Sequence, residues 1–231
     1  MTAIKREERI GGQRLILGDC LEVMRELGPV DAVVTDPPYG IGFGYASHKD
    51  DAEAYPAFMA AAVREALNVC DGPHFWFQGM PQAGRWHQWF PDGFRQMAAC
   101  KTFVQMRKGH VQWAHDPVIF WEGRGPIDET LRDWIIAGPE FHLGRIDHPC
   151  PRPMGHMMQL VHAVCGTILD PFMGSGTTLV ACQKLGRQGI GIELDPEYFD
   201  IACRRVEEAA RQPDLFVSEP QLVPNQDTFD L

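Results

Sequence analysis

The sequence has few of the features that mark membrane, secreted or metal-binding proteins. No apolar run approaches the length of a membrane span, and the segment Met1–Ile10 is too charged for a signal peptide. Its 7 cysteines are scattered and none forms a CxxC pair, which argues against a zinc site and for reduced thiols. These absences predict a cytoplasmic protein that uses no metal.

The length and composition predict a single α/β domain. The chain has 231 residues, 45% of them hydrophobic and 23% charged, which is ordinary for a soluble globular protein. No internal repeat or second domain is visible. We expect the folded domain to span residues 1–211 and an acidic, flexible tail to span 212–231.

The net charge of −10 disfavours a nucleic-acid partner, but the charge is unevenly distributed. Between residues 85 and 115 there are five basic and one acidic residues, a local charge of +4. Local patches, and not net charge, bind phosphates. The side chains that we expect to contact DNA phosphates are Arg85, Arg107, Lys108 and His110; the alternative is an ordinary solvated surface.

An acidic turn with two prolines follows the apolar run at residues 32–34. The turn places Asp36 where a buried strand ends, which is where open α/β sheets hold ligands. The prolines stiffen the turn and leave their carbonyls free to accept hydrogen bonds. A carboxylate beside a free carbonyl suits capture of an amino group, and Tyr39 offers a face on which a base could stack. The alternative is a simple turn with a core tyrosine.

A second dense pattern begins at Thr167, with an apolar strand that ends in Asp170. A Gly-Ser-Gly turn, a helix and another strand ending in Glu193 follow it. Strand, glycine-rich turn, helix, strand and acid is the order of an adenosine-binding βαβ unit, in which the acid binds the ribose hydroxyls.

Other glycine-rich motifs are excluded by single residues in this turn. No lysine follows Gly176, so it is not a Walker loop. Ser175 lacks a glycine two positions before it, so it is not a hydrolase elbow. The spacing also differs from the GxGxxG dinucleotide fingerprint, and the full βαβ context of the turn predicts a nucleoside site.

Together these motifs resemble the amino-group DNA methyltransferases that use S-adenosylmethionine. DPPY at 36–39 with DPFMGSGTT at 170–178 downstream is similar to the permuted subgroup called the beta class. Gly18-Asp19-Cys20 resembles the family's short motif upstream of DPPY. The stretch 148–153 resembles its "HPTxKP" motif, with Cys150 and Arg152 in place of the usual Thr and Lys.

The resemblance implies a circularly permuted class I methyltransferase fold: a Rossmann-like, seven-stranded, mostly parallel sheet with helices on both faces. It implies that the catalytic residues are Asp36, Pro37, Pro38 and Tyr39. It implies that the cofactor S-adenosylmethionine is bound by Asp19, Cys20, Asp36, His148, Arg152, Asp170, Phe172, Gly174, Ser175, Gly176, Thr177, Glu193 and Leu194. No metal is implied.

The implied activity is methyl transfer to N6 of an adenine that has left the DNA duplex. Alternatives are cytosine N4, an RNA or protein-amide acceptor, or an idle DNA-binding module of the same fold. A short target-recognition insertion is expected over residues 123–147, which implies a short target or weak selectivity. DNA is the expected partner, in a bacterial or phage-infected cytoplasm, and a second copy of the chain could complete a homodimer.

The tail carries one further motif. Gln212, Leu215 and Phe216 resemble the Gln-x-x-Leu-Phe peptides that dock on bacterial sliding clamps. The alternative is that Leu215 and Phe216 pack on the protein's own core.

Overall fold

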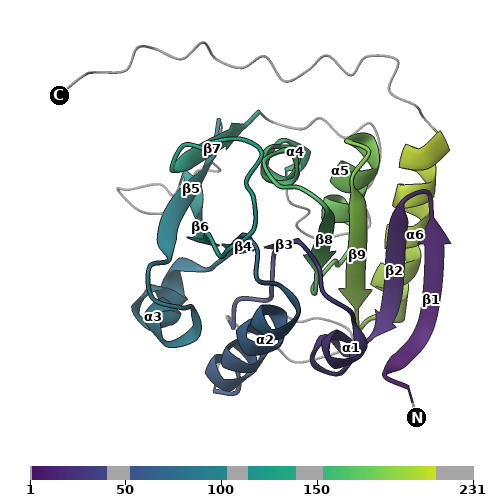
Figure 1. Cartoon of the computed structure of the whole chain (residues 1–231), viewed down its shortest axis with the longest axis horizontal. Helices are drawn as coiled ribbons and strands as arrows, with labels where there is room; N and C mark the ends of the chain where they lie inside the picture. The colour runs from purple at the N-terminus through teal and green to yellow at the C-terminus, as the bar shows by residue number, and fades with distance from the viewer. Residues whose placement is uncertain (1, 41–52, 103–113, 139–152, 212–231) are drawn as a thin grey trace, which may run out of the picture.

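The computed structural model describes residues 2–40, 53–102, 114–138 and 153–211. These residues form a Rossmann-like α/β fold in which helices cover both faces of a mixed sheet (Figure 1). None of the helices in these ranges combines the length and the apolar run that a bilayer crossing requires.

The described residues contain a nine-stranded sheet in the order β1-β2-β9-β8-β3-β4-β6-β5-β7. The strands are β1 (Ile4–Ile10), β2 (Gln13–Gly18), β3 (Ala32–Thr35), β4 (His74–Phe77), β5 (Arg95–Lys101), β6 (His115–Trp121), β7 (Trp134–Ala137), β8 (Thr167–Asp170) and β9 (Gln188–Glu193). The pairs β2–β9, β9–β8, β8–β3, β3–β4 and β5–β7 are parallel, and the other three are antiparallel.

The helices form two layers, one on each face of the sheet (Figure 1). The first layer holds α1 (Cys20–Glu26), α2 (Tyr55–Val69) and α3 (Trp86–Trp89), which follows the 3-10 helix η1 (Met80–Arg85). The second layer holds α4 (Met154–His162), α5 (Thr177–Lys184) and α6 (Pro196–Arg211).

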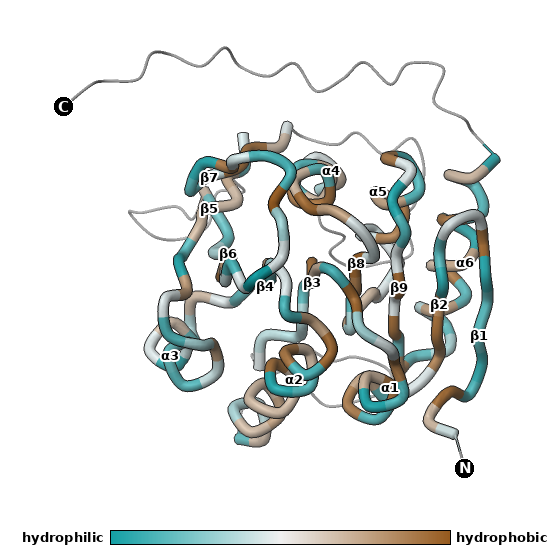
Figure 2. The backbone as a smooth tube through the Cα atoms, viewed as in Figure 1, coloured by the Kyte–Doolittle hydropathy of each residue, from teal (hydrophilic) through white to brown (hydrophobic). Residues whose placement is uncertain are grey.

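The central strands β3 and β4 are buried at every position because both faces of the sheet are covered, and hydrophobic residues are concentrated on the inner strands (Figure 2). Successive side chains point to opposite faces, so Val33 packs in the core beneath α1 and α2 while Val34 packs in the core beneath α4. Phe75 and Trp76 divide between the two cores in the same way. The alternation along each strand therefore fixes which of the two cores each side chain enters.

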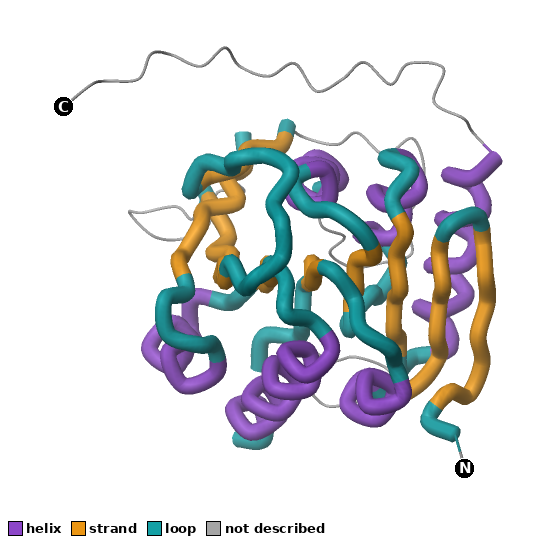
Figure 3. The backbone as a smooth tube through the Cα atoms, viewed as in Figure 1, coloured by secondary structure: helices purple, strands orange, loops and turns teal. Residues whose placement is uncertain are grey.

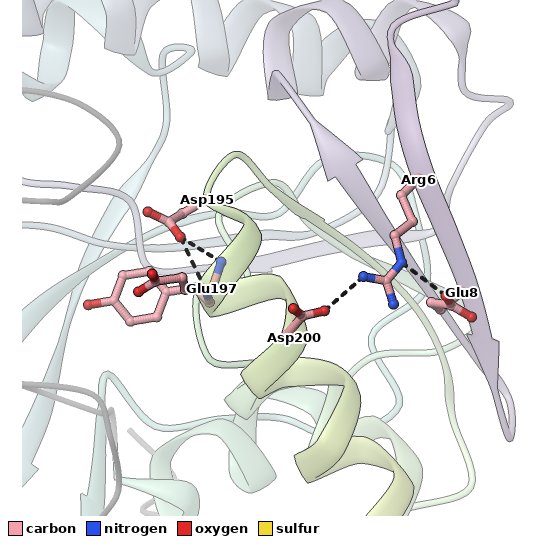
Figure 4. A network of polar contacts seen from close by, with 6 residues as sticks. Arg6, Glu8, Asp195, Glu197 and Asp200 are labelled. Carbon is pink, nitrogen blue, oxygen red and sulfur yellow. Dashed lines mark hydrogen bonds and ion pairs between the residues drawn. The ribbon is translucent and has the colours of Figure 1, made fainter.

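The expected fold class is confirmed, and the expected number of strands is wrong. Seven central strands, from β2 to β5 in the sheet order, have one extra strand at each edge: β1 and β7 (Figure 3). β1 carries five charged residues, so it lacks the apolar pattern that identifies a buried strand. Its pairing with β2, and the ion pair of Arg6 with Asp200 on α6 at 2.8 Å, hold it in place (Figure 4).

One edge of the sheet collects the ends of the strands that carry the predicted motifs. The register of the parallel pairs places Asp170 and Glu193 at the carboxyl ends of β8 and β9, and Asp36 directly after the carboxyl end of β3. The opposite edge carries the stretch at the start of the predicted insertion: the amide of Arg124 donates to Asp71 O at 2.6 Å. The first part of the 123–147 insertion thus lies away from the motif edge, whereas β7 returns the chain to it.

Candidate active site

The two predicted loops meet across a single pair of strands. β3 and β8 are parallel neighbours, with Val33 opposite Leu169. Just beyond that point, Thr35 Oγ1 donates a hydrogen bond to Asp170 Oδ1 at 2.6 Å. The Asp-Pro-Pro-Tyr turn and the glycine-rich turn, about 130 residues apart in the chain, therefore start side by side.

Asp36 and Tyr39 contact each other within the proline turn. The phenol hydroxyl of Tyr39 donates to Asp36 Oδ1 at 2.5 Å, and both side chains are half-buried. Pro37 between them is buried, which fixes the backbone of the turn. The carboxylate and the aromatic ring that the sequence predicts as an amine clamp are thus one hydrogen-bonded unit.

The segment after β4 supports this turn from one side. Gln82 Nε2 donates to Tyr39 O at 3.3 Å. A Cβ added at Gly79 would lie 3.1 Å from Tyr39 Cβ, so the missing side chain lets the two backbones approach. The support comes from η1 and from Gly79, its N-cap residue.

The glycine-rich turn depends on two residues with left-handed backbone. Gly174 has φ +50° and Gly176, the N-cap of α5, has φ +81°. A Cβ at Gly176 would lie 2.9 Å from the Cβ of Ala202 on α6. The turn therefore tolerates no side chain at Gly176, and its compact backbone, with Gly176 N donating to Met173 O at 2.7 Å, leaves room for the close approach expected of a nucleoside-binding turn.

Glu193 lies across from this turn at the end of β9. Gly174 N donates to Glu193 Oε2 at 2.9 Å, and Asp195 N donates to Oε1 at 2.8 Å. Removal from water outweighs these two hydrogen bonds, and the pKa of Glu193 is raised to about 7. Each oxygen retains a second lone pair, so this carboxylate can accept hydrogen bonds from vicinal hydroxyl groups.

Asp170 lies beneath the turn and has a supporting position. Its carboxylate is only 2% exposed and accepts from Thr35, from the side chain of Thr178 and from Phe172 N at 3.1 Å. Burial raises the pKa of Asp170 to about 6. The hydrogen bonds act against this rise, whereas the negative charge of nearby Asp36 adds to it. A direct contact between Asp170 and the cofactor stays a prediction.

Arg205 on α6 is a site residue that the sequence reasoning missed. Its Nη1 donates to Ser175 O at 2.6 Å, to Ser175 Oγ at 2.8 Å and to Thr177 Oγ1 at 3.2 Å. The signal was weak: Arg205 lies beside the buried Val206, at the margin of the apolar face of the final helix. This guanidinium fixes the glycine-rich turn from behind.

The remaining predicted cofactor residues lie at the same edge. Asp19 caps α1, with Oδ1 accepting from Leu21 N at 2.8 Å, and Cys20 is buried in the core, which raises the pKa of its thiol. Leu194 is exposed, and Asp195 next to it caps α6 through Glu197 N at 2.8 Å (Figure 4). Phe172 packs edge-on against Trp76 and Phe58.

Several predicted residues lie outside the described residues: His148, Arg152, Arg107, Lys108, His110, Gln212, Leu215 and Phe216. Their roles stay predictions. Of the predicted DNA contacts, Arg85 is described, exposed and located at the end of η1, three residues after Gln82. Within the described ranges, no group of three or more His, Cys, Asp or Glu side chains could hold a metal ion.

Comparison with known sequences gives a family match for part of the chain. Residues 127–204 match the family model described as DNA methylase (N6_N4_Mtase). YubD of Escherichia coli (strain K12) is 28% identical over 89% of this chain and 98% of its own length. The type II methyltransferase M.ScaI of Streptomyces caespitosus is 25% identical over 84% of this chain and 81% of that protein.

Comparison with solved structures identifies the same fold. The M1.HpyAVI–SAM complex has a TM-score of 0.65 at 23% identity, over 84% of this chain and 98% of that one. The PvuII DNA methyltransferase (cytosine-N4-specific) has a TM-score of 0.71 at 14% identity, over 90% and 94% of the two chains. The family match and the relatives together support an amino-group DNA methyltransferase.

Proposed function

We propose that this protein transfers a methyl group from S-adenosylmethionine to N6 of a flipped-out adenine in DNA. The observation that supports this most directly is the meeting of two turns, linked by the Thr35–Asp170 hydrogen bond: one suited to a nucleoside and one to an amine. The order of the two motifs in the chain, amine turn first, favours the permuted beta class.

The residues of the glycine-rich turn fit the methyl donor. Glu193 can accept from the ribose hydroxyls, and the absence of side chains at Gly174 and Gly176 lets the nucleoside approach the turn. Asp19 and Phe172 lie at the same edge for contacts with the adenine, and His148 and Arg152 are proposed to hold the methionine end. S-adenosylmethionine supplies an already activated methyl group on a sulfonium sulfur.

The protein's part in the reaction is alignment and activation of the amine. An exocyclic amine on an aromatic ring is a poor nucleophile because its lone pair is delocalised into the ring. Hydrogen bonds from its two protons to Asp36 and to Pro37 O favour a tetrahedral nitrogen with a localised pair. Tyr39 stacks on the base, and the turn as a whole holds the nitrogen in line for transfer.

DNA approaches from the edge that carries both turns. Arg85 is exposed at the end of η1, the 3-10 helix whose Gln82 donates to Tyr39 O. We propose that Arg85 contacts a phosphate near the flipped base, together with Arg107, Lys108 and His110. Target reading is assigned to the later part of the 123–147 insertion, beyond β7, since its first residues lie at the opposite edge. A homodimer and sliding-clamp docking through Gln212, Leu215 and Phe216 are further proposals.

Cytosine N4 is the second candidate acceptor. Adenine and cytosine both present an amino group beside a ring nitrogen, and the PvuII enzyme of the same fold is named as cytosine-N4-specific. The Asp at position 36 favours adenine, because the cytosine enzymes more often carry Ser there.

Labelled methyl transfer tests the proposal. The full chain is incubated with methyl-tritiated S-adenosylmethionine and DNA, RNA or no nucleic acid, and the products are digested to nucleosides. We expect label in N6-methyldeoxyadenosine, and none with Asp36→Ala, which should still bind the methyl donor. Label in N4-methyldeoxycytidine would move the assignment to cytosine, and absence of label from DNA would overturn the proposal.

A further inference from the structure

The side chain of Gln78 is buried without hydrogen-bond partners. Gln78 is 1% exposed, and in the described part of the chain neither Nε2 nor Oε1 has a partner. Buried side-chain amides almost always have partners, because an unpaired amide loses its bonds to water and gains nothing in return. An orphaned amide of this kind is a candidate for pairing with a bound ligand.

The position of Gln78 connects this amide to the amine turn. Gln78 directly follows β4, which pairs with β3 in a parallel register that sets Thr35 opposite Trp76. Two residues after this pair in each of the two segments, Pro37 is level with Gln78. The next residue, Gly79, packs on Tyr39, so the segment runs alongside the whole Asp-Pro-Pro-Tyr turn.

The backbone holds Gln78 in one orientation. Its N–H donates to Pro117 O at 2.9 Å, which continues the β4–β6 ladder by one step. Alternation along the strand places its side chain on the same face as Trp76, whose ring packs against Phe172 of the cofactor turn. The amide therefore lies on the side of the sheet where the two turns meet.

We propose that Gln78 binds the target base by donating a hydrogen bond from Nε2 to a ring nitrogen beside the target amine. This inference rests on the proposed function. Asp36 and Pro37 O take the amine protons, which leaves the neighbouring ring nitrogen as an acceptor that needs a donor. The Nε2 of a glutamine is a hydrogen-bond donor, and the unprotonated ring nitrogen next to the amine is an acceptor for it.

A second buried glutamine provides a matched control. Gln13 is 2% exposed, but its Nε2 donates to Arg187 O at 2.9 Å and it lies at the start of β2, away from the amine turn. Gln13→Leu removes an amide whose Nε2 is hydrogen-bonded although its Oε1 has no partner among the described residues, and Gln78→Leu removes an amide in which neither atom is paired. The two substitutions change volume and polarity equally, so they separate a structural role from a substrate role.

The test measures stability and methyl transfer for both variants. We expect Gln78→Leu to keep or increase the urea midpoint and the affinity for S-adenosylmethionine while lowering kcat/KM on DNA at least twentyfold. Gln13→Leu should lower the midpoint and keep kcat/KM per folded molecule. If Gln78→Leu lowers the midpoint like Gln13→Leu and leaves kcat/KM unchanged, the amide has a structural role and the proposal is wrong.

Base analogues identify the contact itself. Oligonucleotides with 1-deazaadenine or 7-deazaadenine lack one ring nitrogen each, and 3-deazacytosine serves if cytosine is the acceptor. For one analogue, we expect the loss of kcat/KM relative to the natural base to be at least tenfold smaller in Gln78→Leu than in the wild type. Equal losses for every analogue would overturn the contact. Wild-type methyl transfer to natural DNA is measured alongside, so failure of the proposed function is seen separately.

Discussion

The hydroxyl of Tyr39 donates to Oδ1 of Asp36 at 2.5 Å, on the carboxylate that the proposed reaction needs as an acceptor. In this arrangement the phenol hydroxyl donates to the oxygen that is proposed to accept an amine proton, so the half-buried carboxylate is hydrogen-bonded. Entry of a base requires this bond to be exchanged for one from the substrate. Tyr39 thus has two separable parts, a hydroxyl that competes with the base and a ring on which the base stacks.

Substitutions at Tyr39 should separate these parts. Tyr39→Phe removes the competing hydroxyl and keeps the ring, so KM for DNA should stay the same or fall. Tyr39→Ala removes the stacking partner, which contributes roughly 1–3 kcal/mol per base, and KM should rise by roughly five- to 150-fold. Steady-state kinetics with saturating S-adenosylmethionine measure both. A loss of equal size in Tyr39→Phe would show that the hydroxyl serves the reaction and does not compete with it.

Cofactor affinity should depend on pH through Glu193. Its pKa is raised to about 7 by burial, so the carboxyl is largely protonated at pH 6 and ionised at pH 8. Ribose hydroxyls donate to the ionised form, and the Kd for S-adenosylmethionine should therefore fall by roughly tenfold between pH 6 and pH 8. Calorimetric titration across this range measures the slope, which Glu193→Gln should remove.

The stability of the ligand-free protein should change with pH in the opposite direction. Because the folded pKa of Glu193 lies above the unfolded value, its contribution to the free energy of unfolding is fully present below the unfolded pKa. That contribution is lost as pH rises towards about 7. Asp170, with a pKa raised to about 6, acts with the same sign, so the comparison of wild type with Glu193→Gln isolates the part due to Glu193.

Removal of the Arg205 guanidinium should weaken cofactor binding. Arg205→Ala leaves Ser175 and Thr177 without their donor, and hydrogen bonds to charged groups contribute about 1.5–3 kcal/mol each. We expect the Kd for S-adenosylmethionine to rise at least tenfold while KM for DNA changes little. Arg204→Ala, at the exposed neighbouring position, is the control. Equal effects of the two substitutions would remove Arg205 from the site.

Alanine substitutions at three glycines separate the cost of left-handed backbone strain from the cost of a steric contact, which occurs at Gly176 of the glycine-rich turn. An added Cβ at Gly28 meets no atom within 4 Å and φ there is not positive, Gly186 has φ +65° with open space, and Gly176 has φ +81° with Ala202 at 2.9 Å. Alanine should be near neutral at Gly28 and cost about 1–2 kcal/mol at Gly186 from left-handed backbone strain. At Gly176 the contact adds to the strain, so the loss should be the largest. Urea denaturation measures the series, and equal losses at Gly186 and Gly176 would show that α6 moves to accommodate the methyl group.

Sequence patterns predicted the central elements because their physical signals are local. A strand buried on both faces is apolar at every position, as at residues 32–34, and a turn with positive φ requires glycine, as at Gly176. The same local signals predicted Asp36, Tyr39 and Glu193 as site residues. The edge strands escaped detection because β1 is highly charged and β7 alternates over only four residues.

By itself, the sequence determined the chemistry that is available: a carboxylate after one buried strand, a glycine turn after another and an acid after a third. The tertiary structure alone decided that β3 and β8 are neighbours, that Arg205 reaches back to the glycine turn and that Gln78 is buried beside the amine turn. The reason is that strand order and hydrogen-bond partners depend on residues far apart in the chain. Local periodicity carries no information about which of those distant segments will pack together.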